Sequence, residues 1–383
     1  LNRCLMGWLG KNYHKVILAG IIIVALAIRL YFAFQTPYFS DDSSYFALRQ
    51  IEEIASTGTP LFNDDLSYGG RTYMFTPLFH YILAAFSLFL PSVLVGKLIP
   101  NIFAVSLVVI SYLLAIEISK DRQSALVVAM ISAFIPILFS QTVNSISLYS
   151  LVIPLFALSI LLFIKMHKDI RYGYPLVGVI SALAFIHPSA LLLVLAFSIY
   201  LILLKLEDIK ESKAEIEVVL FSFMLVIWVL LILYKNSIME EGLSIIWQSI
   251  PASLLPIYFS SITILGAIAS IGVIPFVYGI VTIYRYLFRK KTRFTYLFIS
   301  FALLIGLLII FNGIMINIGL MFLGMVLTIL YSIHYKQSRD FLSRTKLSRL
   351  KTFFMFTLVI AIIASQLLPS IYLTQESVKD APS

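Results

Sequence analysis

Charged residues are scarce in this sequence, and their scarcity decides its structural class. Only 12% of the 383 residues are Asp, Glu, Lys or Arg, whereas 60% are hydrophobic. A soluble globular chain carries about 25% charged residues, so this composition excludes a water-soluble fold. Apolar runs of about 17–20 residues recur along the whole chain, which is typical of membrane-spanning helices. The composition therefore predicts an all-α polytopic membrane protein.

Cysteine is almost absent, and so are the common short catalytic motifs. Cys4 is the single cysteine, which excludes an intramolecular disulfide framework. No P-loop, dinucleotide fingerprint, zinc-ligand spacing or nucleophile elbow stands out. The formal net charge is +9, but the basic residues lie between the apolar runs. Membrane topology explains that placement better than a nucleic-acid partner does.

Hydropathy and charge together predict the topology. We expect eleven spans, near 16–34, 94–117, 125–139, 148–166, 174–187, 188–204, 216–235, 262–284, 294–311, 318–335 and 352–369. The apolar segment Thr76–Leu90 is short for a crossing helix, so we place it at the membrane surface. Most of the 28 Lys and Arg then fall on one side of the membrane, as the positive-inside rule requires. The amino terminus is therefore expected in the cytoplasm and the carboxyl terminus outside.

The chain is predicted to form a single transmembrane domain over 1–383, with no separate soluble domain. Its longest connection is the first outer loop, residues 35–93, which contains two aspartate pairs, Asp41-Asp42 and Asp64-Asp65. Ser40, Asp41 and Asp42 have the pattern of a helix start, and Gly58 marks its end. Apolar residues recur there at helical spacing, which predicts an amphipathic helix in the membrane interface. A second interfacial helix is expected from Pro77 to Leu90.

Two interpretations of Asp41 and Asp42 stand side by side. Acidic residues in the first turn of a helix cap free N–H groups and stabilise the helix dipole without any further function. However, neighbouring helical positions point about 100° apart, so one carboxylate is free to face inward while the other caps. The pair also lies where a span leaves the bilayer, which is a costly place for idle charge. A carboxylate held there is suited to accept a proton from a hydroxyl group.

The order of these segments resembles the GT-C glycosyltransferases. The resemblance rests on a first span, the sequence DDSSYFALRQI, a glycine-bearing loop, TPLFHYILAAF, the span ending YLLAIEISKDR and the next span ALVVAMISAFIPILF. It covers roughly residues 16–204. Protein O-mannosyltransferases, aminoarabinose transferases and oligosaccharyltransferases belong to this group. The resemblance implies a polyprenyl-phosphate-linked sugar donor, inverting transfer at the extracytoplasmic face, and Asp41 or Asp42 as the general base.

A phosphate leaving group needs positive charge or N–H donors at the outer face. Few basic side chains lie near that face, and the candidates for substrate contact are Arg71, His187, Lys235, His80 and Arg29, together with the acidic Asp64 and Asp65. Alternatives remain for several of them. Arg71 is equally suited to pair with Asp64 or Asp65, and Lys97 and Lys235 at span ends fit ordinary snorkelling. Arg29 is expected to pair with Asp41, Asp42 or a phosphate.

The sequence departs from the oligosaccharyltransferase pattern in its second outer loop, SQTVNSISLY (140–149). In those enzymes a further acidic motif in this loop completes a metal site, whereas this loop contains no acid. A divalent cation stays an alternative without a second acidic motif to support it, and Asp64-Asp65 or Glu240-Glu241 would supply ligands only through a fold that the sequence does not predict. No cofactor is assigned. Acceptor selection, for a lipid, glycan or protein, is expected from the outer loops, especially 236–261, or from a partner subunit.

Two other functions stay open on the sequence alone. One is a catalytically silent GT-C-like subunit that acts as a scaffold in a complex. The other is a transporter or flippase of a lipid-linked substrate, with Asp41-Asp42 as a gate charge. Most span interiors lack the ionisable residues that ion-coupled carriers usually need, so the glycosyltransferase is the leading hypothesis.

Overall fold

The computed structural model describes residues 2–64, 70–72, 75–241, 262–289, 291–345 and 349–379, with the side chains of 2–11, 71–72, 237 and 240–241 left aside. The described elements are α1 (Asn2–Ala33), α2 (Asp42–Thr57), β1 (Asn63–Asp64), β2 (Arg71–Thr72), α3 (Leu78–Ser87), α4 (Ser92–Ser119), α5 (Arg122–Ala133), α6 (Pro136–Ser140), α7 (Tyr149–Met166), the 3₁₀ turn η1 (Ile170–Tyr172), α8 (Gly173–Ile186), α9 (Ala190–Leu206), α10 (Lys213–Leu233), α11 (Lys235–Glu241), α14 (Ile264–Ile271), α15 (Val273–Phe288), α16 (Arg293–Ile310), α17 (Ile316–Arg344) and α18 (Lys351–Lys379).

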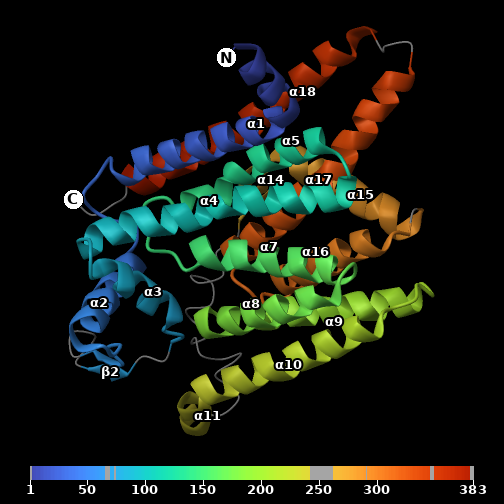
Figure 1. Ribbon diagram of the computed structural model, residues 1–383. Coiled ribbons are helices and arrows are strands. Elements are labelled where there is room, and N and C mark those ends of the chain that lie inside the picture. The colour runs from blue at the N-terminus through green and yellow to red at the C-terminus, as the bar shows by residue number, and fades with distance from the viewer. Residues whose placement is uncertain are drawn as a thin grey trace.

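The long helices lie side by side in one bundle (Figure 1). In the described part of the chain, seven helices are long and apolar enough to cross a membrane, or eight if α14 and α15 form one span. The apolar helices α5, α8 and α9 are shorter. The predicted class, an all-α polytopic membrane protein, is confirmed. The number of eleven spans stays a prediction.

The connections between the helices lie at the two ends of the bundle. Helices α2 and α3 lie together at one end, on the left in Figure 1, and the α4–α5 and α9–α10 turns lie at the opposite end. We call these the outer end and the inner end, following the predicted orientation. Helix α3 has 10 residues and packs against α2. That length is far below the roughly 20 residues of a crossing helix, as expected for a helix in the membrane interface.

Aromatic side chains fill the centre of the bundle around α7. The ring of Phe156 lies 5.2 Å from that of Phe301 on α16 and 4.8 Å from that of Phe322 on α17. Phe163, two turns further along α7, stacks on Phe197 of α9 with ring centroids 4.4 Å apart. Such pairs contribute about 0.5–1.5 kcal/mol beyond the area they bury. These ring contacts connect α7 to α9, α16 and α17 inside the bundle.

Two of the predicted spans are broken in the structure. The segment 125–139 divides into α5 and α6 before Pro136, because proline has no N–H to donate and disfavours a helical residue before it. The segment 262–284 divides at Gly272 into α14 and α15, which are bent by 96°. Each of these two predicted spans therefore consists of two helices.

Gly272 is required by its backbone conformation and by its neighbour. Its φ of 99° is a conformation that side-chain-bearing residues rarely adopt. A Cβ atom at this position would lie 1.8 Å from Nε2 of Gln366, a buried residue of α18. The side chain of Gln366 therefore packs directly on the break between α14 and α15.

We expect Gly272→Ala to lower the midpoint of thermal unfolding in detergent, because the strained backbone alone costs about 1–3 kcal/mol. Gly178→Ala is the matched control, since a Cβ added at Gly178 in α8 would have nothing within 4 Å. Alanine favours a helix over glycine by roughly 0.5–1 kcal/mol, so the control should unfold at the same or a higher temperature. Equal midpoints for the two variants would contradict this role of Gly272.

Candidate active site

Asp41 is the N-cap of α2 and also contacts the second outer loop. One carboxylate oxygen accepts hydrogen bonds from the backbone N–H of Ser44, at 2.7 Å, and from the Ser44 hydroxyl. The other oxygen accepts a hydrogen bond from the hydroxyl of Ser145. The predicted start of this helix and its end at Gly58, with φ 80°, are both confirmed. The carboxylate of Asp41 therefore has a fixed orientation between two loops, whereas Asp42 is exposed on the first turn.

The second outer loop is hydrogen-bonded along its length to the chain that leaves α1. The backbone N–H of Ser40 donates to the carbonyl of Asn144 at 3.0 Å. The Asn144 side-chain amide donates to the carbonyl of Tyr38 at 3.0 Å and to the Ser40 hydroxyl at 2.9 Å. The N–H of Ile146 donates to the Ser44 hydroxyl at 2.8 Å. The two loops are thus joined immediately beside Asp41.

Lys97 of α4 is hydrogen-bonded to both segments at this junction. Its ammonium donates to the carbonyl oxygens of Ala33 at 2.7 Å, Thr36 and Tyr38 at 3.3 Å, and to Oδ1 of Asn144 at 3.2 Å. Its side chain is only 3% exposed, so the expectation that it snorkels to the headgroups was wrong. The ammonium instead fixes the exit of α1 to the second outer loop.

Arg29 lies one layer deeper and continues the same network. Its Nε donates to Oδ1 of Asn101 at 2.9 Å, and its terminal nitrogen donates to the hydroxyl of Thr142. The guanidinium also lies over the ring of Phe139, 5.0 Å from its centroid. Asn101 in turn donates to the carbonyl of Val143 at 2.8 Å. Contrary to expectation, the described partners of Arg29 are neutral groups rather than Asp41 or Asp42.

Sequence analysis missed this network, although a signal for it existed. Lys97 and Asn101 are four residues apart in an otherwise apolar helix, so they share one face. Gly96 allows the loops to approach that face, because a Cβ there would lie 2.7 Å from Ile146 and 3.1 Å from Phe39. Polar residues at helical spacing inside a span usually face protein rather than lipid. The spacing of Lys97 and Asn101 was therefore the signal in the sequence for a buried polar network at this helix face.

The two predicted histidines are buried to different degrees, and burial acts on the pKa of both. His187 lies in the turn between α8 and α9, where Nδ1 accepts the N–H of Ser189 at 3.1 Å and Nε2 lies 3.3 Å from the hydroxyl of Tyr149. Desolvation lowers the pKa of His187 to about 4 and that of His80 to about 4. His80 is buried on α3 between aromatic rings, 5.2 Å from that of Phe75. Burial therefore disfavours the protonated, positively charged form of both rings.

The remaining predicted residues that the structure describes lie in two different places. Asp64 forms an ion pair with Arg49 of α2. The expected partner, Arg71, faces Asp64 across the β1–β2 pair in the backbone register, and its side chain lies outside the described part. Lys235 is exposed at the start of α11. Asp65 lies outside the described residues, as does most of the expected acceptor loop (242–261).

The residues around Asp41 do not fit a hard divalent cation. Such ions take several oxygen ligands, preferably carboxylates, and Asp41 is the one carboxylate at this junction for which contacts are described. The amide oxygen of Asn144 is occupied by the ammonium of Lys97. Within the described residues, no group of three His, Cys, Asp or Glu is arranged to hold a metal. The described groups at the junction therefore hydrogen-bond the carboxylate of Asp41 and do not form a set of cation ligands.

Comparison with known proteins identifies the fold. No family model and no curated protein matches the sequence. Among solved structures, the oligosaccharyltransferase of Archaeoglobus fulgidus in its apo form has a TM-score of 0.72 at 13% identity, over 98% of this chain and 57% of that chain. The same protein in complex with Zn and sulfate has a TM-score of 0.64 at 13% identity, over 95% of this chain and 54% of that one. This chain thus has an oligosaccharyltransferase-like, GT-C-like fold and spans a little over half of its neighbour's length.

We expect Lys97→Met to lower the thermal unfolding midpoint strongly. The substitution keeps the apolar stem but leaves buried carbonyl and amide oxygens without a donor, and each such group costs about 1–3 kcal/mol. Lys235→Met is the matched control, because Lys235 is exposed, and its midpoint should equal that of the wild type. Thermal unfolding of the purified proteins in detergent measures both. A Lys97→Met midpoint equal to that of the control would refute the proposed network.

Proposed function

We propose that this protein is a membrane glycosyltransferase that transfers a sugar from a polyprenyl-phosphate-linked donor to an acceptor at the extracytoplasmic face, with inversion. The observation that carries the proposal is the carboxylate of Asp41, held by both outer loops at the exit of α1. The oligosaccharyltransferase-like fold supports a transferase of the GT-C type. The donor class follows from the resemblance to GT-C enzymes.

In this proposal Asp41 is the general base. A catalytic group has to be held in position by its own hydrogen bonds, and Asp41 meets this condition through Ser44 and Ser145. The carboxylate takes the proton of the acceptor hydroxyl while that oxygen attacks the anomeric carbon. The bond between the anomeric carbon and the phosphate oxygen breaks, and the polyprenyl phosphate leaves with the electron pair.

The leaving phosphate is assigned to groups that the buried network does not use. Arg29 and Lys97 donate their hydrogen bonds to protein oxygens. In this proposal they position the two outer loops and do not contact the phosphate. Lys235 and Arg71 are the cations assigned to the phosphate. His187 contributes a hydrogen bond rather than a charge, because its Nδ1 is occupied by Ser189 and its ring proton lies on Nε2.

We derive no step from a divalent cation. The neighbouring archaeal enzyme was solved in a complex with Zn and sulfate, but the junction around Asp41 in this chain offers an amide, a hydroxyl and an ammonium where further carboxylates would be needed. The acceptor, whether lipid, glycan or protein, is recognised by the outer loops or by a partner subunit in this proposal.

The test separates the role of Asp41 as a base from its role as a helix cap. Asparagine and serine cap a helix about as well as aspartate does, but neither accepts a proton at neutral pH. Purified wild type, Asp41→Asn, Asp41→Ser and Asp42→Asn proteins in liposomes receive radiolabelled polyprenyl-phosphate sugars and a membrane extract as the acceptor source. Transferred label and thermal unfolding are measured for each.

We expect both Asp41 variants to lose transfer by about 100-fold or more, as for the removal of a general base, with unfolding midpoints close to the wild type. Asp42→Asn should keep most of the activity. Full transfer by the Asp41 variants would refute Asp41 as the base. Absence of transfer from every donor with the wild-type protein would favour the silent scaffold or the lipid-linked substrate carrier.

A further inference from the structure

A basic cavity lies at the inner end of the bundle, far along the helices from Asp41. Its volume is about 580 Å³, and it lies where α1, the start of α5, the end of α17 and the start of α18 meet. Four cations and two carboxylates line it: Lys120, Arg122, Arg339, Lys351, Asp121 and Asp340. The proposed sugar transfer uses none of these residues.

Two of the four cations are available to a ligand. Arg339 is committed to Asp121 by two hydrogen bonds, at 2.9 and 3.0 Å. Lys120 donates to Glu117 at 2.7 Å. Arg122 and Lys351 have no ion-pair partner within the described residues. The cavity therefore offers two uncommitted positive charges beside a fixed Arg339–Asp121 pair, which suits an anion.

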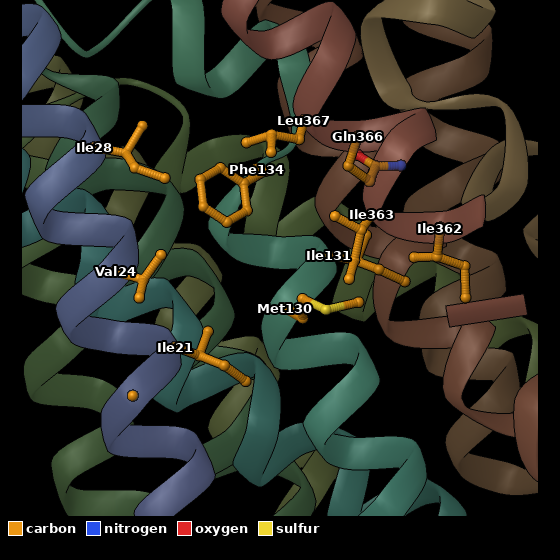
Figure 2. Close-up of a pocket in the computed structure, with 11 residues that line it drawn as sticks. Ile21, Val24, Ile28, Met130, Ile131, Phe134, Ile362, Ile363, Gln366 and Leu367 are labelled. Atoms are coloured by element: carbon orange, nitrogen blue, oxygen red, sulfur yellow. The ribbon is translucent and has the colours of Figure 1, made fainter. Parts of the chain in front are cut away.

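An apolar groove lies deeper in the bundle, between three of these four helices, α1, α5 and α18. It has a volume of about 300 Å³ and is lined by residues of α1, α5 and α18. Figure 2 shows Ile21, Val24 and Ile28 of α1 on one side, Phe134 of α5 in the middle and Leu367 of α18 on the other side. Apart from Gln366, whose amide packs on Gly272, the lining is hydrocarbon or thioether.

The spacing of cavity and groove matches the two parts of one lipid. On α1, the basic cavity is lined by Tyr13 and the groove begins at Gly20, a rise of about 10 Å at 1.5 Å per residue. The groove ends at Ile28, about 22 Å from Tyr13 by the same rise. One leaflet contributes about half of a hydrocarbon core of roughly 30 Å. A headgroup in the cavity would thus place an acyl chain in the groove.

We propose that this site binds an anionic phospholipid of the leaflet at the inner end. The phosphate lies between Arg122 and Lys351, and one acyl chain lies in the groove between α1, α5 and α18. Basic pockets between membrane helices at the cytoplasmic side recognise anionic headgroups in this way. A zwitterionic lipid is disfavoured because its headgroup cation would meet the same positive charges.

Native mass spectrometry of the full chain released from mixed micelles tests the proposal. The protein is equilibrated with phosphatidylglycerol, with phosphatidylcholine, or with phosphatidylglycerol and excess inorganic phosphate. The charge variant is Arg122→Gln with Lys351→Gln. Its matched control is Arg171→Gln with Arg289→Gln, which removes two exposed cations from other inner loops. Val24→Trp fills the groove without changing any charge.

We expect wild-type protein and the control to retain phosphatidylglycerol in preference to phosphatidylcholine. The charge variant should lose this retention roughly tenfold or more, because two basic contacts to an anionic headgroup are removed. Val24→Trp should lose it as well, and inorganic phosphate should not displace the lipid. Equal retention of both lipids by the wild type, or unchanged retention by the charge variant or by Val24→Trp, would overturn the proposal. Complete displacement by inorganic phosphate would show an anion site without a lipid and would also overturn it.

Discussion

The arrangement of the outer end depends on one buried ammonium group. Lys97 reaches three carbonyl oxygens where the chain leaves α1 and the side chain of Asn144 in the second outer loop. A buried charge without partners is very costly, and here it is stabilised because its donors are satisfied by oxygens from two separate segments. Those segments have to stay together for the charge to remain buried. The position of Asp41 between the loops follows from that requirement.

The burial of the Lys97 ammonium also determines which chemical groups lie at the site. The two outer loops are joined through an ammonium, an amide and hydroxyl groups, and they present a single oriented carboxylate, that of Asp41. The guanidinium of Arg29 supports the second outer loop from one layer deeper, through Thr142 and Asn101. The positive charges nearest the site, those of Lys97 and Arg29, therefore belong to side chains whose positions are fixed by hydrogen bonds within the fold. At the inner end, by contrast, Arg122 and Lys351 have no ion-pair partner among the residues that the structure describes.

Local patterns were sufficient to predict the elements that carry the candidate site. The sequence around Asp41 and Gly58 contains both helix boundaries, because capping depends on neighbouring residues only. The charge bias placed α3 at the surface, which its length of 10 residues supports. The partners of Lys97 and the break at Gly272 could not be predicted in the same way. They depend on Asn144 and on Gln366, which lie far away in the sequence and meet these positions only in the folded chain.

The Lys97 ammonium holds the first outer loop against the second. Electron–electron distance measurement between spin labels at Ser56→Cys and Gln141→Cys, in a Cys4→Ser background, tests this role directly, since both labelled positions are exposed. We expect one narrow distance distribution for the protein with Lys97 intact and for Lys235→Met. For Lys97→Met we expect a broad distribution. A distribution for Lys97→Met that stays as narrow as that of the parent protein would contradict this role of Lys97.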